Sequence, residues 1–475
     1  DAKDHDDAVH AEPDTDPNNP GGHIVIVAIA DVAAYVRPGS ALDREAYLRG
    51  NSVYFPDRVV PMLPERISND LCSLKEGEAR PSLAVRMIFD AEGRKRRHSF
   101  HRVLFRSAAR LSYQQVQAAI DGRPDDKTGP LLEPILRPLY AAYAAMAKAR
   151  DKRGPLDLDL PERKIILDKA GMVADVRTPE RLETMRLIEE MMIAANVAAA
   201  ETLEKHKSAL LYRVHDTPSR EKLTALRDFL ATLDLSFGKS EAVRPADFNR
   251  VLAKARDSER TQQVSEMVLR SQAQAEYSAE NYGHFGLNLD RYAHFTSPIR
   301  RYADLIVHRA LIAALDFGKD GLTDDEAAHL PGIAQHISTT ERRAMLAERE
   351  TSDRLLAQFL AGKIGAEFDG RISGVTRSGL FVRLSETGAD GFIPASTIGQ
   401  DYYRFVEEMQ AMVGDRTGET FRIGDQVRVR LLEAAPVAGA LRFELLSEGG
   451  RGKRSSLKHG SKGPSHHYGP KGRRR

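Results

Sequence analysis

The chain has 475 residues with a net charge of +2, and 41% of them are hydrophobic. This length suits two or three domains, and the hydrophobic fraction supplies a sizeable core, which excludes a wholly disordered protein. No hydrophobic run approaches the roughly 20 residues of a membrane-spanning helix, and Cys72, the only cysteine, cannot form an internal disulfide, so we expect a cytoplasmic protein without membrane contact.

The first segment, DAKDHDDAV, is crowded with the carboxylates of Asp1, Asp4, Asp6 and Asp7. Ionised carboxylates this close repel one another unless they share protons or bind a cation. Oxygen ligands of this kind suit Mg²⁺ or Mn²⁺. Side chains alternate along an extended segment, so only an irregular backbone would turn Asp7 to the side of Asp4 and Asp6. A metal site therefore predicts irregular structure here, and the alternative is an exposed, solvated acidic end.

The elements that follow are a strand and then helices. The β-branched run at 24–30 predicts a buried strand. A cap, a proline and an acid in succession predict a helix over 179–207. A second helix is predicted over 297–315, starting at the Ser-Pro pair. A third helical region runs over 326–362 and is broken at Pro331.

Two segments predict contacts with nucleic acid. GNSVYFP places Tyr54 and Phe55 beside a turn, where either ring could stack on a base, although one of them could instead be core. The helix predicted at 297 has Arg300 and Arg301 in its first turn, where the helix dipole disfavours cations. A helix N-terminus with two guanidinium groups is a strong phosphate site. The alternative is that the arginines pair with carboxylates, and this is more expected for Arg301 than for Arg300.

Short alternating strands spaced by turns fill residues 366–448. Five strands in this length predict a small barrel of the OB type. Phe381 and Phe392 fall on these strands among Arg371, Arg377 and Arg383, a combination that suits base stacking and phosphate pairing. Core packing is the favoured interpretation for Phe392, whereas for Phe381 both interpretations stay open, and we take Phe381 as a candidate RNA-binding residue.

The last segment, 449–475, is basic and poor in hydrophobic residues. Residues 451–475 contain nine Lys or Arg and no Asp or Glu, and without them the rest of the chain has a charge of −7. Such a composition predicts a disordered tail that attracts a polyanion, with solubilisation as the alternative role.

Several of these motifs, in collinear order, resemble the bacterial ribonuclease II and ribonuclease R family. They are DAKDHDDAV, GNSVYFPDRVVPMLPE, LSYQQV, IEEMMIAANVAAA, LYRVHD, GHFGLNLDRYAHFTSPIRRYADLIVHR and AERETSDR. The resemblance covers residues 1 to about 360 and is closer to ribonuclease R. It implies a processive 3′-to-5′ exoribonuclease that uses a metal to hydrolyse RNA to nucleoside 5′-monophosphates. The implied fold class is α+β, with a mixed α/β catalytic domain at 1–365 before the barrel and the tail.

The resemblance also implies roles for particular residues. Asp4, Asp6 and Asp7 match the acidic metal positions, and Asp6 matches the aspartate most closely tied to catalysis. Arg300 matches the arginine that contacts the phosphate at the scissile bond.

Two further residues match positions that contact the RNA itself. Tyr54 matches a tyrosine that stacks on terminal bases, and Glu348 matches a glutamate near the 3′ nucleotide. Stacking and backbone contacts accept any sequence, as a degradative enzyme needs.

The chain departs from the family pattern in three ways. A further metal-binding aspartate, expected six residues before Asp4, and the N-terminal RNA-binding domains are missing, so we expect a fragment of a longer protein. His5 replaces an apolar residue and is expected to point away from the metal ligands. Leu158 stands where some relatives have a stacking phenylalanine, so no stacking is assigned there.

The leading hypothesis is therefore an exoribonuclease that acts on single-stranded RNA, and on structured RNA as a further candidate, as a monomer. The alternative is an RNA-binding protein with a catalytically inactive nuclease domain, because one expected carboxylate is missing. A metal phosphatase for small molecules is disfavoured, since it would need neither the barrel nor the basic tail.

Overall fold

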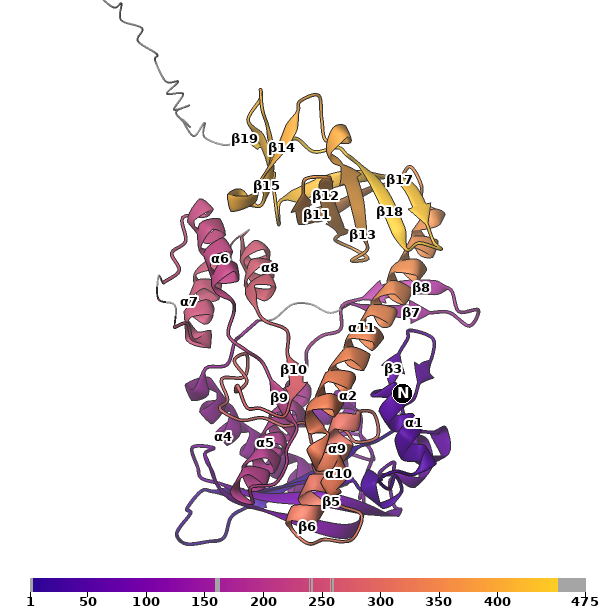
Figure 1. The fold of residues 1–475 in the computed structure, drawn as a ribbon, viewed down its shortest axis with the longest axis vertical. Coiled ribbons are helices and arrows are strands. Elements are labelled where there is room, and N and C mark those ends of the chain that lie inside the picture. Colours follow the sequence, from indigo (N-terminus) through magenta and orange to yellow (C-terminus); the bar gives the residue numbers. More distant parts are fainter. Residues whose placement is uncertain are drawn as a thin grey trace, which may run out of the picture.

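The computed structural model describes residues 3–158, 163–238, 240, 242–256, 258 and 260–451. It shows a mixed α/β part followed by a closed barrel (Figure 1), which confirms the predicted fold class. Within the described residues, no helix is long and apolar enough to cross a membrane. The predicted disordered tail lies outside the described residues from 452 onwards, so it stays a prediction.

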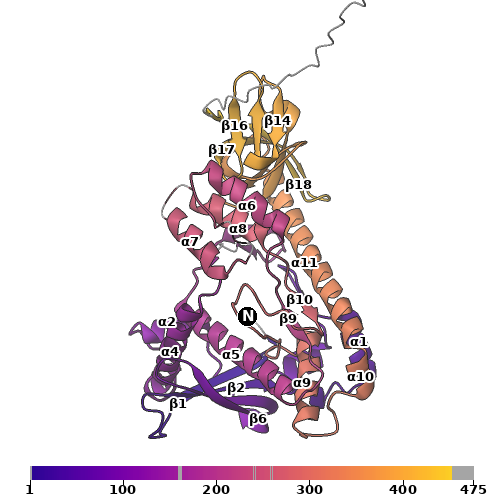
Figure 2. The same cartoon turned by 60° about the vertical axis from the view of Figure 1, so that its left-hand side comes forward.

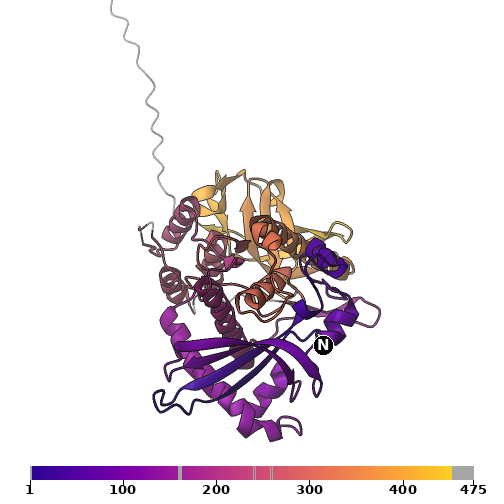
Figure 3. The same cartoon turned by 60° about the horizontal axis from the view of Figure 1, so that its bottom comes forward.

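A four-stranded antiparallel sheet organises the first part of the chain. Its strands are β1 (Asp7–Pro13), β2 (His23–Ala30), β5 (Ala79–Phe89) and β6 (Lys95–Arg106), in the order β1-β2-β5-β6. The buried strand predicted over 24–30 is confirmed as β2, which lies inside the sheet. Figure 3 shows the four strands side by side, with helices packed on the sheet.

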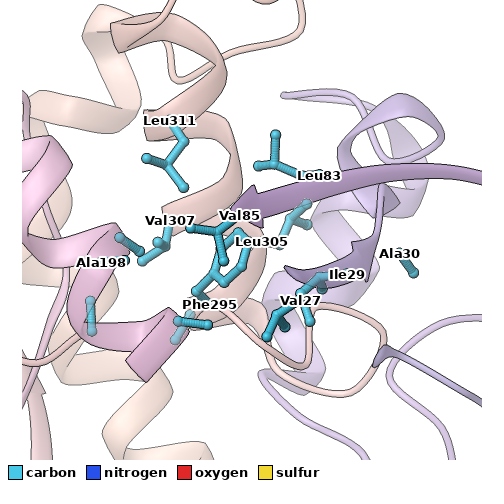
Figure 4. Packing of buried hydrophobic residues seen from close by; sticks show 14 of the residues in the cluster. Val27, Ile29, Ala30, Leu83, Val85, Ala198, Phe295, Leu305, Val307 and Leu311 are labelled. Atoms are coloured by element: carbon cyan, nitrogen blue, oxygen red, sulfur yellow. The ribbon is translucent and has the colours of Figure 1, made fainter. Parts of the chain in front are cut away.

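Three helices pack with this sheet around the larger hydrophobic core: α4 (Arg137–Arg153), α5 (Glu183–Lys205) and α9 (Tyr302–Ala314). Side chains from the sheet, α5 and α9 interdigitate there (Figure 4). The core residues labelled in that view are Val27, Ile29, Ala30, Leu83, Val85, Ala198, Phe295, Leu305, Val307 and Leu311.

Shorter elements connect these parts. They are η1 (Val32–Ala34), α1 (Ala41–Arg49), β3 (Val53–Tyr54), β4 (Val59–Val60), the π-helix η2 (Arg66–Leu71), α2 (Tyr113–Ile120), α3 (Gly129–Leu131), the π-helix η3 (Leu132–Leu136), β7 (Lys164–Leu167), β8 (Val173–Arg177), β9 (Tyr212–Val214) and β10 (Glu276–Ser278).

Two predicted helix starts are wrong by about one turn. The helix predicted from 179 begins at Glu183, because the residues after β8 form the connection to α5 and Leu182 is still extended. The helix predicted from 297 begins at Tyr302, since Arg301 is also extended, with φ −136° and ψ 125°. Before α9 the Pro-containing segment is a turn, and before α5 it is a stretch without regular secondary structure.

The third helical region is α10 (Asp324–Ala328) followed by α11 (Leu330–Ala361). The predicted break is confirmed. It falls at His329, and Pro331 lies in the first turn of α11, where its missing N–H costs nothing. Helix α11 runs from the sheet end of the molecule to the barrel (Figure 1).

The predicted barrel is confirmed as a closed five-stranded one. It consists of β11 (Glu367–Thr376), β12 (Gly379–Leu384), β13 (Asp390–Pro394), β18 (Ala440–Leu445) and β17 (Gln426–Ala435), in that spatial order. A second small sheet was not predicted. It contains β14 (Tyr403–Val406), β15 (Ala411–Gly414), β16 (Glu419–Arg422) and β19 (Gly450–Arg451), with the 3₁₀ turns η4 (Ala395–Thr397) and η5 (Glu407–Met409) nearby in the chain.

The barrel shares a second hydrophobic core with three helices that come earlier in the chain. These are α6 (Arg220–Thr232), α7 (Pro245–Ala255) and α8 (Thr261–Ser271). Figure 2 shows them directly beneath the barrel, beside the end of α11. That end of α11 adds Leu356, Ala357 and Leu360 to the same core. The domain boundary predicted at 365/366 stays a prediction.

Candidate functional site

The acidic segment is ordered. Residues 3–6 have no regular secondary structure, and β1 begins at Asp7, as a metal site predicts. Asp6 is buried, with 4% of its surface exposed. Asp7 keeps contact with solvent, but protein atoms crowd around it. In this structure, therefore, the segment is not a loose solvated end. Asp1 lies outside the described residues.

Ser73, a fully buried residue just after η2, holds the acidic segment in place. Its Oγ accepts a hydrogen bond from the backbone N of His5 at 3.0 Å and donates one to the carbonyl of Lys3 at 2.8 Å. Next to it, Leu74 N donates to the carbonyl of His5 at 3.0 Å. These bonds set the irregular backbone on which Asp4 and Asp6 lie.

Asp6 meets the turn that precedes α9. The backbone N of Ile299 donates to Oδ1 of Asp6 at 2.9 Å, and Nε of Arg300 lies 3.9 Å from Oδ2. Burial raises the pKa of Asp6 well above its usual value, although the Ile299 N–H and Arg300 oppose this effect. Burial also raises the pKa of Asp7. A buried carboxylate and a solvent-exposed one, both with raised pKa values, form a site whose negative charge the protein compensates only in part.

Tyr54 and Glu348 meet at the same site. The hydroxyl of Tyr54 donates to Oδ2 of Asp4 at 3.3 Å, and the backbone N of Tyr54 donates to Oε1 of Glu348 at 2.7 Å. Burial, followed by the charge of Asp4, raises the pKa of Tyr54 to about 12. The ring remains 40% exposed, and Phe55 is half-buried. The structure thus brings together residues that are far apart in sequence, with an exposed ring beside the carboxylates.

The two neighbouring arginines have different environments. Arg300 precedes α9, its side chain is 43% exposed, and its Nη2 donates to Oγ of Ser297 at 3.1 Å. Arg301 is turned inward and donates two hydrogen bonds of 2.7 Å to the carboxylate of Asp304. The prediction that both arginines lie in the first helical turn is wrong, because that turn begins at Tyr302. The alternative of carboxylate pairing is confirmed for Arg301.

Tyr113 is a site residue that the sequence reasoning missed. It is the first residue of α2 and is 42% exposed. Burial raises the pKa of its hydroxyl, the charge of Asp7 adds to this effect, and Arg300 opposes it, so Tyr113 lies within electrostatic reach of Asp7 and Arg300. The signal was present in LSYQQV, because Ser112 and Gln115 form a capping box that fixes the start of α2, where Tyr113 lies.

The donor set suits a divalent cation by its chemistry. In the described part of the chain, no group of three or more His, Cys, Asp or Glu side chains is arranged to hold a metal. Even so, Asp4, Asp6 and Asp7 offer carboxylate oxygens, and the raised pKa values of the last two indicate that a cation would stabilise the ionised pair. Burial lowers the pKa of His5, as does Arg110, and its Nε2 has no hydrogen-bond partner among the described residues.

The barrel presents an aromatic pair. Phe381 is 41% exposed, Phe392 is half-buried, and their ring centroids are 5.1 Å apart on neighbouring strands. The prediction that Phe392 is core is wrong, because Ile393 occupies the inward position next to it and is fully buried. Arg383 lies on the same strand as Phe381 and pairs with Asp390 at 2.9 Å. Aromatic rings beside a guanidinium form a face that suits nucleotides.

Comparisons with known proteins agree with these features. The RNB domain family matches residues 1–316, and the S1 RNA binding domain family matches residues 362–445. Ribonuclease R of Escherichia coli (strain K12) is 39% identical over 457 residues, which is 94% of this chain and 56% of that protein. The chain thus spans about half the length of the curated relatives it matches.

Two solved structures are also similar. Mycoplasma genitalium RNase R in complex with ribose methylated single-stranded RNA superposes with a TM-score of 0.88 at 31% identity, covering 94% of this chain and 69% of that one. The same enzyme in complex with double-stranded RNA gives a TM-score of 0.80 at 30% identity, covering 94% and 73%. The cytoplasmic location and monomeric state expected from the sequence stay predictions.

Proposed function

This chain belongs to the RNB domain family, which includes ribonuclease R, and we propose that it is a processive 3′-to-5′ exoribonuclease that hydrolyses RNA to nucleoside 5′-monophosphates in RNA degradation. The observation that carries the proposal is the meeting of Asp6 with Ile299 and Arg300. A buried carboxylate, a backbone donor and a half-exposed guanidinium at one point suit a phosphodiester beside a metal ion.

Asp4, Asp6 and Asp7 would hold Mg²⁺ or Mn²⁺. When bound, such an ion supplies a Lewis acid that lowers the pKa of water and stabilises a leaving oxygen. The raised pKa values of Asp6 and Asp7 support this assignment, because two neighbouring carboxylates are more stable in their ionised form when a cation is bound to them. Ser73 and the Ile299 N–H keep the ligand oxygens oriented when RNA enters.

The remaining residues bind and orient the substrate. Arg300 is exposed enough to reach a phosphate, and its charge would offset the charge that develops on the phosphate oxygens. Tyr54 would stack on the terminal base, and Glu348 would act at the 3′ nucleotide while it also anchors the backbone of Tyr54. Tyr113 would lie near Asp7 and Arg300, whose charges act on its hydroxyl.

The barrel would bind single-stranded RNA through Phe381 and Phe392, with Arg383 placed to meet the phosphates. Similarity to RNase R structures that contain single-stranded and double-stranded RNA supports single-stranded RNA as the substrate and structured RNA as a further one. No specific observation favours the alternative of an RNA-binding protein with an inactive nuclease domain.

A gel assay on 5′-labelled single-stranded RNA tests the proposal. With Mg²⁺, the label should move to a short 5′ oligomer, and the shortening should be lost with EDTA or in Asp6→Asn, which removes one acidic ligand without loss of bulk. When an excess of unlabelled RNA traps every enzyme that dissociates, labelled products shortened by only a few nucleotides would contradict processivity. RNA that is bound but never shortened would favour the inactive alternative.

A further inference from the structure

The turn 297–302 is held in one shape by Asp304, whose side chain is fully buried. Oδ1 of Asp304 accepts a hydrogen bond from the backbone N of Ser297 at 2.7 Å. The same carboxylate accepts two more from Nε and Nη2 of Arg301, also at 2.7 Å each. Donors at both ends of the turn thus converge on one carboxylate, which fixes the turn more firmly than neutral hydrogen bonds would.

The turn 297–302 also fixes the positions of two groups that contact Asp6. Its middle residue, Ile299, donates its N–H to Oδ1 of Asp6 at 2.9 Å. The next residue, Arg300, is tied to the start of the turn through Oγ of Ser297, and this leaves its Nε 3.9 Å from Oδ2 of Asp6. Both contacts depend on the backbone of the turn, so a change in its shape would displace them together.

The turn also supports the loop that carries Tyr54. The backbone N of Ser52 donates to the carbonyl of Arg300 at 3.0 Å, and the backbone N of Tyr302 donates to the carbonyl of Gly50 at 2.9 Å. Gly50 and Ser52 lie directly before β3, the strand that contains Tyr54. One turn therefore joins the carboxylate, the guanidinium and the stacking platform of the proposed site.

Arg301 supplies the charge that this arrangement needs. Burial opposes its ionisation, but the carboxylate of Asp304 together with Tyr277 and Tyr292 outweighs burial, so the pKa of Arg301 is raised. Asp304 also adds to the upward shift in the pKa of Asp6. Arg301 thus offsets the negative charge that Asp304 brings close to Asp6.

We propose that Asp304 is a positioning residue for RNA hydrolysis, which holds the turn 297–302 so that Ile299 and Arg300 are aligned on Asp6. Asp304 has no exposed surface with which to touch RNA, and it acts through its neighbours. The inference rests on the proposed ribonuclease function, since it concerns the same site.

The test compares Asp304→Asn with Asp320→Asn. Asp320 is a matched control, because it forms a similar paired contact with Arg102, at 2.9 and 2.6 Å, and within the described residues it makes no hydrogen bond or ion pair with Asp6, Ile299 or Arg300. Both variants should lose stability. Assayed well below their melting temperatures, Asp304→Asn should lower kcat on single-stranded RNA by about 10- to 100-fold relative to Asp320→Asn, with KM changed by less than about twofold. On an Arg300→Ala background the loss should be smaller, because the two residues act in the same step.

Equal kcat values for Asp304→Asn and Asp320→Asn, or a full loss that persists on the Arg300→Ala background, would overturn the inference. If Asp304→Asn does not fold, Arg301→Lys takes its place, since it keeps the charge and loses the paired hydrogen bonds. If the unaltered chain leaves RNA intact, the proposed function fails instead. Amide exchange then tests the contacts alone: 297–302 should exchange faster in Asp304→Asn than in Asp320→Asn, and equal exchange would contradict a clamp.

Discussion

The hydroxyl of Tyr54 lies 3.3 Å from Oδ2 of Asp4, so the ring proposed to stack on RNA is joined to a carboxylate proposed to bind metal. The hydroxyl remains a donor at neutral pH, because its pKa is raised to about 12. The hydrogen bond between Tyr54 and Asp4 thus links the residue proposed to stack on RNA with one proposed to bind metal. Substitutions of Tyr54 can separate the two roles.

Tyr54→Ala should change the length of the final RNA product more than it changes RNA binding, since the ring acts only on the terminal bases. Tyr54→Phe keeps the ring, so it should keep the product length while it loses the bond to Asp4. Sequencing gels give the product length. Tyr402→Ala removes a 73% exposed tyrosine from the barrel region and should behave as the unaltered chain does. An identical product from Tyr54→Ala would argue against the stacking role.

Ser73→Ala should reduce hydrolysis, because it removes the two hydrogen bonds that hold the acidic segment. The expected cost in the free energy of unfolding is about 1–3 kcal/mol. Ser82→Ala is the matched control, since Ser82 is equally buried and its Oγ has no hydrogen-bond partner in the described residues. Denaturant unfolding and initial rates on RNA measure both effects. Equal rates for the two variants would show that Ser73 does not position the ligands.

The protein should lose stability as the pH falls below about 6.5, the usual pKa of histidine. Burial, followed by the charges of His215 and Arg213, lowers the pKa of His284 to about 3, and Nδ1 of His284 accepts a hydrogen bond from Leu287 N at 3.2 Å. The unfolded chain therefore binds more protons than the folded one between pH 6.5 and 3, so stability rises with pH across this window and is complete above it.

His284→Gln tests this origin. It should flatten the change in melting temperature between pH 7.5 and pH 5, whereas His329→Gln, on a side chain that is 69% exposed, should leave the change as it is. Differential scanning calorimetry at the two pH values provides the comparison. A larger change in melting temperature between the two pH values in His284→Gln than in the unaltered chain would be inconsistent with a neutral buried imidazole.

Phe381→Ala should weaken the binding of single-stranded RNA, because loss of one stacked base costs about 1–3 kcal/mol. Its melting temperature should hardly change, since the ring is 41% exposed. Val437→Ala removes an 89% exposed hydrophobic side chain from the barrel and serves as the control. Fluorescence anisotropy at fixed salt gives both dissociation constants. Equal affinities would remove Phe381 from the RNA-binding face.

Local patterns predicted the elements well where one periodicity dominates. The strand at 24–30 and the five barrel strands follow from runs of alternating or β-branched residues, and the break near Pro331 follows from its missing donor. The helix starts at 179 and 297 failed for another reason. A Ser-Pro or Thr-Pro pair suits a turn as well as a helix cap, and at 297 the buried carboxylate of Asp304, the third residue of the next helix, selects the turn.

The site was only partly predictable. Acidic crowding indicated Asp4, Asp6 and Asp7, and their assigned roles stay predictions. The role of Ser73 depends on its hydrogen bonds to His5 and Lys3, from which it is separated by 68 and 70 positions in the sequence, and no local pattern encodes such contacts. Phe392 was assigned to the core because a strand pattern does not reveal which face is covered, and Ile393 occupies the inward position instead.

The second core has a consequence for dividing the chain into fragments. Helices α6, α7 and α8 precede residue 365, but their apolar faces pack against the barrel that follows it. A recombinant fragment that ends at Gly362 would therefore expose the apolar faces of three helices to solvent. It should aggregate even though its larger core is intact. The barrel expressed alone would expose the apolar surface against which these three helices pack. The two parts could be expressed as separate folded fragments only if residues 220–271 were kept on the same fragment as the barrel.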